Sequence, residues 1–441
     1  MSIIPMSIQF YDRERELGML NEVARSSRAE LVIVYGRRRI GKTWLVKRFL
    51  ELNPGVYLYV EGPSVKRFLS SASKRFGVEF RGLDDFLKHI FESSARERLV
   101  VVIDEYQRIS RELSPKIQHY WDAYASSSRL KLVLLGSTVG MVERDVSYVG
   151  PLYGRATRVL KLTGFGYSSA RLMLEGLSER EAVKVYSILG GTPYYLALYD
   201  KARDLRSNLY RLFLDLGAPL YDEVERLLTT ELREPLRYIE VMEAISAGRR
   251  TLKEISDYVK LERTQLKKYM LTLERLGLIS RELNAFVKTP PRYRINDFFF
   301  RFYTTFITRL KDYIELRQVD YVLEEIMGRL DSYVGLAFQD ICLMELSKRL
   351  PGYMVASYWD REGNEVDVVA VKGRSALIFE CKFGTLTRAD AKLLKGKLRL
   401  VANKLRLSSA KPYLVTPDVD GELDGVEVLS LRRVVEEGLP P

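Results

Sequence analysis

Residues 32–50 read VIVYGRRRIGKTWLVKRFL: an apolar run, a glycine-bounded loop and an amphipathic segment. The loop at 36–43, GRRRIGKT, satisfies the phosphate-loop pattern G-x-x-x-x-G-K-[ST] between a predicted strand and helix. Gly36 and Gly41 let backbone N–H groups curl around phosphate oxygens at a helix N-terminus, where the dipole favours anions. We expect Lys42 to reach the β- and γ-phosphates of ATP and Thr43 to bind Mg²⁺. The alternative, an arginine-rich surface loop, does not explain the flanking strand and helix.

A second motif, LVVVIDEYQRI at 99–109, is an apolar strand that ends in two acids. We expect it on a strand neighbouring that of the phosphate loop. Asp104 would then hold Mg²⁺ through water, and Glu105 would orient or deprotonate the attacking water. Alone, these acids could simply cap a strand-to-helix turn. Together with the phosphate loop they favour NTP binding and hydrolysis.

The rest of the chain divides into segments with different periodicities. Short Val, Ile and Leu runs alternate with helical stretches up to about residue 165, as in a parallel sheet flanked by helices. A helical pattern follows, in which Ala182, Val185, Tyr186 and Leu189 share one face. The predicted fold class is α/β, with a P-loop NTPase core (1–165), a helical lid (166–230), a winged helix (231–292), a helical connector (293–329) and a last α/β domain (330–441) with strands at 365–371, 376–382 and 413–416.

Composition narrows the functional classes. Of the 441 residues, 46% are hydrophobic and 29% charged, which excludes a disordered tail or a fibre. The net charge of +12 suits a polyanionic partner without identifying one. Two cysteines and two histidines cannot build a disulfide framework or a four-thiolate zinc site. With no apolar run of membrane-spanning length and no secretory signal, we expect a cytoplasmic protein, and the scarcity of Gln and Asn suggests a thermophilic source.

Several boxes together resemble the archaeal ATPase family, which is similar to the AAA+ and STAND groups of NTPases. Over about residues 8–230 they follow one another in the family's order: FYDRERELGML (10–20), the phosphate loop, IDEYQ (103–107), LLGSTVGMVE (134–143), PLYGRATRVLKLTGF (151–165) and LGGTPYYL (189–196). This resemblance implies an ATP-driven switch that could form homo-oligomers.

The resemblance also implies roles for further residues. Ser137 and Thr138 would sense the γ-phosphate, and Arg155 would stabilise its developing charge, in cis or from a neighbouring subunit. Pro193 would contact the base or ribose, and the segment containing Asp12 and Arg13 would lie beside adenine. Structural alternatives remain open: Arg155 could pair with a carboxylate, Ser137 could cap a helix, and the GGTP turn could only end one.

Residues 241–280 have the composition of a DNA-binding winged helix. Leu266, Met270, Leu273 and Leu276 line one face of a helix, and basic residues point elsewhere. We expect the N-terminal part of this helix to enter a major groove while nearby cations meet phosphates. A packed lid or a protein-binding module would show the same pattern. The candidate DNA contacts are Arg249, Arg250, Arg263, Lys267 and Lys268, with Lys288 in the hairpin.

Residues 356–383, ASYWDREGNEVDVVAVKGRSALIFECKF, contain two carboxylates and a lysine on predicted strands. Residues two apart share a strand face, so Glu380 and Lys382 point together and Cys381 points to the opposite layer. If the strands pair as a hairpin, Asp367 comes beside Glu380 and the two could bind Mg²⁺ or Mn²⁺. The metal would polarise a scissile phosphate, and Lys382 would position water or stabilise charge. An exposed hairpin with salt bridges is the alternative.

Asp367, Glu380 and Lys382 resemble the PD-(D/E)xK nuclease core, so the last domain is expected to be restriction-endonuclease-like. Such nucleases often carry a glutamate on the preceding helix, where this chain has Gln339, with Asp340 and Glu345 as imperfect substitutes. Glu365 shares the strand face of Asp367 and could assist.

Three functions compete at this point. The first is an ATP-driven switch that binds DNA and carries a metal-dependent nuclease domain. The second is a regulatory ATPase whose C-terminal modules bind DNA or protein without cleavage. The third is an ATP-dependent remodeller of protein complexes.

Overall fold

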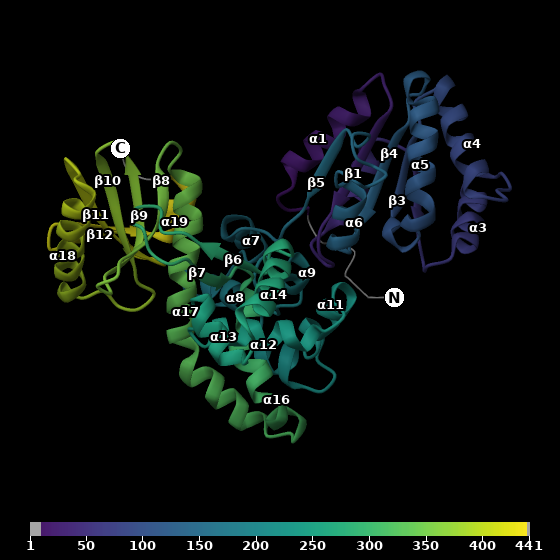
Figure 1. Ribbon diagram of the computed structural model, residues 1–441. Helices are drawn as coiled ribbons and strands as arrows, with labels where there is room; N and C mark the ends of the chain where they lie inside the picture. Colours follow the sequence, from purple (N-terminus) through teal and green to yellow (C-terminus); the bar gives the residue numbers. More distant parts are fainter. Residues whose placement is uncertain (1–9, 439–441) are drawn as a thin grey trace. The chain divides into compact units, whose positions relative to one another are not determined.

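A computed structural model describes residues 10–438, which belong to two compact units, one ending at Gly164 and the other beginning at Phe165 (Figure 1). Within 10–438, no helix combines the length and the apolar character needed to cross a membrane.

The first unit is built on a five-stranded sheet in the order β2–β3–β4–β1–β5, with every pair parallel. The central strands β1, β3 and β4 are buried throughout, which explains their uninterrupted apolar sequences. The predicted parallel sheet is therefore confirmed. Its strands are β1 (Glu30–Tyr35), β2 (Val56–Tyr59), β3 (Val100–Asp104), β4 (Lys131–Gly136) and β5 (Arg158–Lys161).

One expectation about this sheet was wrong. The strand that ends in Asp104 does not neighbour the phosphate-loop strand, because β4 lies between β3 and β1 and pairs with both. An apolar run shows that a strand is buried, but it does not give the order of the strands.

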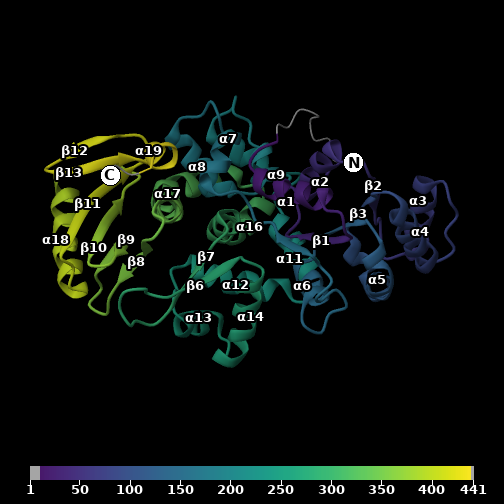
Figure 2. The ribbon, with the colours of Figure 1, turned by 90° about the horizontal axis from the view of Figure 1, so that it is seen from above.

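Helices cover both faces of the first sheet. Figure 2 shows α1 and α2 on one side and α5 and α6 on the other. Leu20 and Val23 of α1 and Val46 and Phe49 of α2 pack on strand residues in one buried cluster. The helices of this unit are α1 (Glu14–Arg25), α2 (Lys42–Leu52), α3 (Val65–Phe76), α4 (Leu83–Arg96), α5 (Ser110–Tyr124) and α6 (Val139–Val146).

The second unit begins with short helices. Ser178 and Glu181 form a capping box that starts α8, and Gly190, at φ +63°, follows its end. The four apolar residues predicted to share a face of α8 are buried, as expected. The helices are α7 (Tyr167–Met173), α8 (Glu179–Leu189), α9 (Pro193–Ala197), α10 (Leu205–Leu209), which continues into a π-helical turn over 210–214, and α11 (Glu223–Glu231).

Three helices and a two-stranded antiparallel hairpin come next, and we call residues 235–295 the helix–hairpin segment. Thr251 and Glu254 form the capping box of its second helix. Leu266, Met270, Leu273 and Leu276 are buried, in agreement with the predicted apolar face. The elements are α12 (Pro235–Ser246), α13 (Leu252–Val259), α14 (Arg263–Arg275), β6 (Ile279–Glu282) and β7 (Arg292–Ile295).

An aromatic connector leads into one long helix. The connector consists of α15 (Phe298–Phe302), a π-helical turn over 303–307 and α16 (Thr308–Glu315), and most of its aromatic side chains are buried. Helix α17 (Val319–Arg349) then runs for 31 residues without a break, through the position where the sequence analysis places a domain boundary.

The chain ends in a six-stranded mixed sheet of order β12–β13–β11–β10–β9–β8. Strands β8, β9 and β10 are antiparallel neighbours, whereas β11 runs parallel to β10 after the crossover helix α18. Figures 1 and 2 show α18 and α17 on opposite faces of this sheet. The elements are β8 (Met354–Trp359), β9 (Glu365–Lys372), β10 (Ser375–Cys381), α18 (Arg388–Leu405), β11 (Ser409–Thr416), β12 (Gly421–Leu423), β13 (Val426–Ser430) and α19 (Leu431–Glu436); β8, β12 and β13 were not predicted.

Candidate functional site

The phosphate loop joins β1 to α2. Gly36 has a φ of +152°, and a Cβ there would lie 2.3 Å from the carbonyl oxygen of Leu162, so only glycine fits. Gly41 has a φ of +93° and immediately precedes α2, whose first residue is Lys42. The Lys42 ammonium is buried and donates to the carbonyl oxygens of Gly36 (2.7 Å) and Arg37 (2.8 Å). The loop therefore brings the Lys42 ammonium to the N-terminus of α2, the end of a helix that favours anions.

The two nucleotide motifs meet through Thr43 and Asp104. The Thr43 hydroxyl donates to Oδ2 of Asp104 at 3.0 Å, although β3 and β1 are not adjacent. Tyr57 of β2, which the sequence analysis missed, donates to the same oxygen at 2.6 Å. Burial, followed by its contact with Asp104, raises the pKa of the Tyr57 phenol well above its usual range, so the hydroxyl remains a donor.

The side-chain amide of Gln107 links Glu105 to Ser137 through two hydrogen bonds. The Gln107 Nε2 atom donates to Oε2 of Glu105 and to Oγ of Ser137, each at 3.1 Å. Glu105 has a left-handed φ of +59° and forms an ion pair of 3.3 Å with Arg108. Gln107 is buried and comes from the short turn after β3, whereas Ser137 follows β4. Sequence reasoning did not identify Gln107, although it lies two residues after Glu105.

Arg155 lies in an ion pair, which was one of its two predicted roles. Its Nε and Nη2 atoms donate to the two carboxylate oxygens of Asp122 at 2.8 and 2.7 Å, and Nη1 donates to the Tyr153 carbonyl. The Asp122 hydrogen bond raises the pKa of the guanidinium and lowers that of the carboxyl. Because Asp122 lies on α5, these two parallel hydrogen bonds hold the Arg155 side chain against that helix.

The other predicted nucleotide contacts lie at turns. Asp12 has a left-handed φ of +36°, and the buried Arg13 guanidinium donates to Glu16 and to the Thr163 carbonyl. Thr138 occupies the N-cap position of α6 without a side-chain cap bond. Pro193 belongs to the second unit, where it begins α9.

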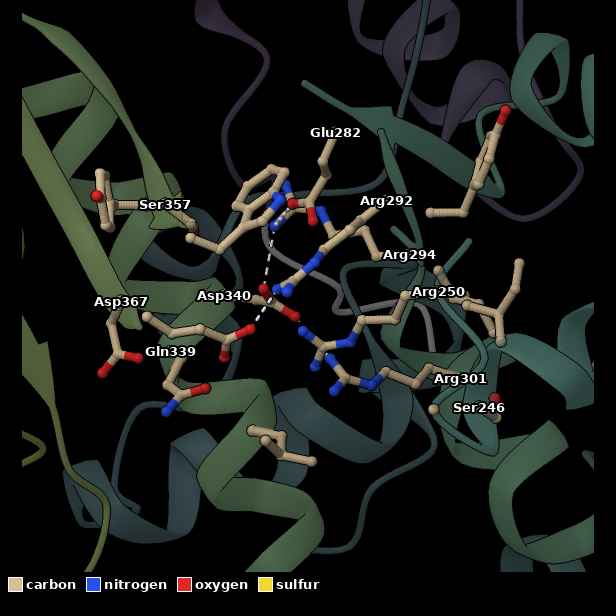
Figure 3. A pocket seen from close by; sticks show the side chains of 18 of the residues that line it. Ser246, Arg250, Glu282, Arg292, Arg294, Arg301, Gln339, Asp340, Ser357 and Asp367 are labelled. Atoms are coloured by element: carbon tan, nitrogen blue, oxygen red, sulfur yellow. Dashed lines mark hydrogen bonds and ion pairs between the residues drawn. The ribbon is translucent and has the colours of Figure 1, made fainter. Parts of the chain in front are cut away.

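The predicted DNA contacts form two groups. Arg263, Lys267 and Lys268 are exposed on α14, opposite its buried face. Arg249 and Arg250 follow α12 in a turn, and Arg250 also lines a pocket shown in Figure 3. Lys288 is exposed between β6 and β7.

The two predicted carboxylates come together as expected. Strands β9 and β10 are antiparallel and Val368 pairs with Phe379; Asp367 immediately precedes Val368, and Glu380 immediately follows Phe379. Asp367 accepts the backbone N–H of Cys381 at 2.8 Å. Burial, and then the negative charge of Glu380, raise the pKa of Asp367 to about 7. These carboxylates are called the acidic pair below.

The lysine that is ion-paired with Glu380 is Lys397, which the sequence did not indicate. Lys397 of α18 donates to Oε1 of Glu380 at 2.5 Å. Strand β10 ends at Cys381, and the ammonium of Lys382 is bound by Asp390, also at 2.5 Å. Lys382 is therefore paired with Asp390, in the first turn of α18, and not directly with Glu380. Cys381 does point to the opposite layer, where its thiol contacts that of Cys342.

The acids named as possible third ligands are mostly engaged elsewhere. Asp340 accepts from Arg294 (3.0 Å) and Arg301 (2.6 Å), and Glu365 is paired with Arg292. Glu345 is buried in α17, where Lys348 is bound to it at 2.8 Å. Gln339 does line the same pocket as Asp367 (Figure 3).

Both sites carry oxygen donors that suit a divalent cation. At the acidic pair, Oε2 of Glu380 is buried and has no hydrogen-bond partner, and burial raises the pKa of Glu380 as well. A cation there would compensate the desolvated charge. Within residues 10–438, however, no three His, Cys, Asp or Glu side chains are grouped so that they could hold a metal. The acidic pair therefore supplies two carboxylate ligands.

Two protein families match separate parts of the chain. Residues 10–199 match the family described as an ATPase domain predominantly from Archaea, and residues 303–394 match archaea bacterial proteins of unknown function. An uncharacterized protein of Methanocaldococcus jannaschii is 32% identical over 423 residues, covering 92% of this chain and 94% of that protein. An uncharacterized ATP-binding protein of the same organism is 48% identical over 44 residues, which are 10% of this chain and 75% of that one.

Solved structures of similar chains include two ATP-related proteins. A Walker-type ATPase of Pyrococcus abyssi is 21% identical and covers 69% of this chain and 99% of its own, with a TM-score of 0.49. The Aeropyrum pernix ORC2 protein, in ADPNP–ADP complexes, is 15% identical and covers 72% and 98%, with a TM-score of 0.47.

Proposed function

Because the chain belongs to the archaeal ATPase family, we propose that it is a switch that binds ATP and hydrolyses it with Mg²⁺. The observation that carries this proposal is the 3.0 Å hydrogen bond between Thr43 of the phosphate loop and Asp104 of β3. The two groups that would hold a magnesium ion are thereby already in contact.

Each residue has a chemical role in this proposal. Lys42 exchanges its two carbonyl partners for phosphate oxygens, and Thr43 and Asp104 hold Mg²⁺, which would neutralise charge on the phosphates. Glu105 orients the attacking water and accepts its proton. Gln107 transmits the position of Ser137, the γ-phosphate sensor, to Glu105 through its two hydrogen bonds.

Calorimetry with ATP and Mg²⁺ tests this assignment. Lys42→Ala should abolish binding, whereas Glu105→Gln should retain binding and stop turnover. Lys47→Ala is a matched control, since Lys47 is an exposed lysine of the same helix. Equal ATP affinity of the wild type and Lys42→Ala would refute the site.

We further propose that the helix–hairpin segment is a winged helix that binds DNA through α14. The support is the exposed basic face of this helix, with Arg263, Lys267 and Lys268, opposite an apolar buried face. Such contacts act on phosphates, so binding would extend over many sequences and weaken with salt.

A second activity, metal-dependent cleavage of phosphodiesters, is proposed for the acidic pair. The unpartnered, buried Oε2 of Glu380 beside Asp367 supports it. Asp367 and Glu380 would hold Mg²⁺ or Mn²⁺, which would polarise the scissile phosphate. Lys397, rather than Lys382, has an ammonium group in contact with this pair. Mn²⁺ should support more activity, because Mg²⁺ demands a near-ideal octahedral ligand set.

Incubation with plasmid, linear and single-stranded DNA, with or without ATP and Mg²⁺ or Mn²⁺, tests cleavage. Products that depend on Mn²⁺ and disappear in Glu380→Ala support a nuclease. Cleavage that survives Glu380→Ala refutes this site. If ATP is hydrolysed and DNA is bound but never cut, the chain is instead a regulatory ATPase with non-catalytic C-terminal modules.

A further inference from the structure

Four arginines converge on one pocket of the second unit (Figure 3). They come from three places: Arg250 from the turn after α12, Arg292 and Arg294 from β7, and Arg301 from α15. The pocket encloses about 150 Å³, and Asp367 of the acidic pair lines it too. It therefore joins the helix–hairpin segment to the sheet that carries the acidic pair.

Ion pairs hold three of these guanidinium groups in place. Asp340 accepts from both Arg294 and Arg301, and Glu282 forms a second ion pair of 2.9 Å with Arg294. Arg292 is paired with Glu365 and stacks over the ring of Trp359, with 4.8 Å between its guanidinium carbon and the ring centroid. The fork of each arginine is thus oriented before any ligand arrives.

The four arginines of the pocket are not all ion-paired. Three acids, Glu282, Asp340 and Glu365, are matched to three arginines. Among residues 10–438, Arg250 makes no side-chain hydrogen bond or ion pair, although its charge acts on the nearby carboxylate of Glu282. An anion could therefore bind the guanidinium of Arg250, which has no hydrogen bond or ion pair. It could also bind Arg301, because the acid that pairs with Arg301, Asp340, is shared with Arg294.

We propose that this pocket binds a phosphate group of a nucleic-acid strand, through Arg250 and Arg301, and so positions the strand beside the acidic pair. The volume suits a single phosphate group with part of its sugar, since a cavity of this size accepts a molecule the size of benzene. A guanidinium donates two parallel hydrogen bonds to phosphate oxygens, which fixes orientation as well as position. This inference rests on the proposed DNA binding, and it adds the place where a strand is held.

Fluorescence anisotropy with a labelled single strand tests the pocket in EDTA, where no cleavage takes place. Two strands of the same sequence are compared, one with a 5′-phosphate and one with a 5′-hydroxyl. All proteins carry Lys42→Ala, so that the phosphate loop does not contribute. The variant is Arg250→Ala, and its matched control is Arg281→Ala, which removes one exposed arginine of β6 outside the pocket.

Arg250→Ala should weaken binding about tenfold, as expected for one charge-assisted hydrogen bond, and Arg281→Ala less than twofold. A loss confined to the 5′-phosphorylated strand shows that a strand end occupies the pocket, and an equal loss for both strands shows an internal phosphodiester. Equal effects of Arg250→Ala and Arg281→Ala overturn the proposal.

Calorimetry with inorganic phosphate separates this inference from the proposed DNA binding. If the chain binds no strand but binds phosphate in a way that Arg250→Ala removes, the DNA-binding function fails and the phosphate site stands. If strands bind and neither strand nor phosphate binding depends on Arg250, the phosphate site fails and DNA binding stands.

Discussion

Replacing Asp367 by Asn should stabilise the C-terminal sheet at neutral and alkaline pH. The carboxyl of Asp367 has its pKa raised from 3.8 to about 7, first by burial and then by Glu380. An asparagine can still accept the backbone N–H of Cys381 through its amide oxygen, so the hydrogen bond of 2.8 Å is preserved. The substitution thus removes mainly the cost of a buried charge.

The sign and size of the effect follow from proton linkage. Between about pH 4 and pH 7 the folded chain keeps a proton on Asp367 that the unfolded chain has lost, so stability falls as pH rises through this window. Two pH units at 1.36 kcal/mol each give about 3 kcal/mol between pH 5 and pH 7. This is an upper limit, because the side chain is partly exposed and water screens its charge.

Denaturant unfolding followed by the fluorescence of Trp359 measures this difference. Trp359 is a buried residue of β8, and the other tryptophans, Trp44 and Trp121, are replaced by Phe so that only the second unit reports. Wild type and Asp367→Asn are compared from pH 5 to pH 8. Asp424→Asn is the control, because it removes an exposed carboxylate from the same domain at a φ of +50°, which asparagine tolerates.

The advantage of Asp367→Asn over the wild type should grow by up to about 3 kcal/mol between pH 5 and pH 7 and then level off. Asp424→Asn should show a constant difference. Added Mn²⁺ should stabilise the wild type above pH 7 and leave Asp367→Asn unchanged. Parallel pH profiles of wild type and Asp367→Asn would refute the raised pKa of the Asp367 carboxyl and with it the argument for a cation.

Three further predictions address the other sites. Gln107→Leu should lower kcat for ATP hydrolysis about tenfold, a loss of about 1.4 kcal/mol, without changing ATP affinity, because Gln107 bonds Glu105 and Ser137; unchanged steady-state kcat would contradict this role. The double substitution Lys267→Glu and Lys268→Glu should weaken binding to DNA of many sequences. The slope of log binding constant against log salt concentration should fall by about 0.9 for each lost phosphate contact. If wild type and variant bind DNA identically at several salt concentrations, α14 faces another partner. Gln339→Glu should tighten Mn²⁺ binding in calorimetry, because Gln339 lines the pocket of Asp367; unchanged affinity would show that a carboxylate there cannot reach the metal.

Much of the fold was predictable because buried elements have characteristic patterns of apolar residues in the sequence. The uninterrupted apolar runs of β1, β3 and β4 correspond to strands buried on both faces, and the apolar face of α14 corresponds to its buried residues. The order of the strands was not predictable, because it depends on which edges pair after the chain has crossed the sheet. Strand β8 was missed for a related reason: only two of its six residues are buried.

The nucleotide motifs were readable because backbone geometry restricts their residue types. Gly36 must lack a Cβ to pass the Leu162 carbonyl, and this requirement appears directly in the sequence. Tyr57 and Gln107 had no such signal. Tyr57 bonds Asp104 on a different strand, and Gln107 links Glu105 to Ser137, which follows another strand.

At the acidic pair, strand spacing predicts the two carboxylates but not the lysine that is paired with Glu380. The period of two correctly placed Asp367 beside Glu380 and turned Cys381 to the opposite layer, because both conclusions concern residues within the hairpin. Lys382 lies one residue beyond β10, where the capping box of Thr387 and Asp390 already begins to determine the geometry. Asp390 is part of that cap and also a carboxylate, so it binds Lys382, while Lys397, almost two turns further along α18, reaches Glu380. Which lysine accompanies the pair is therefore decided by how α18 packs on β10, a contact that strand spacing does not encode.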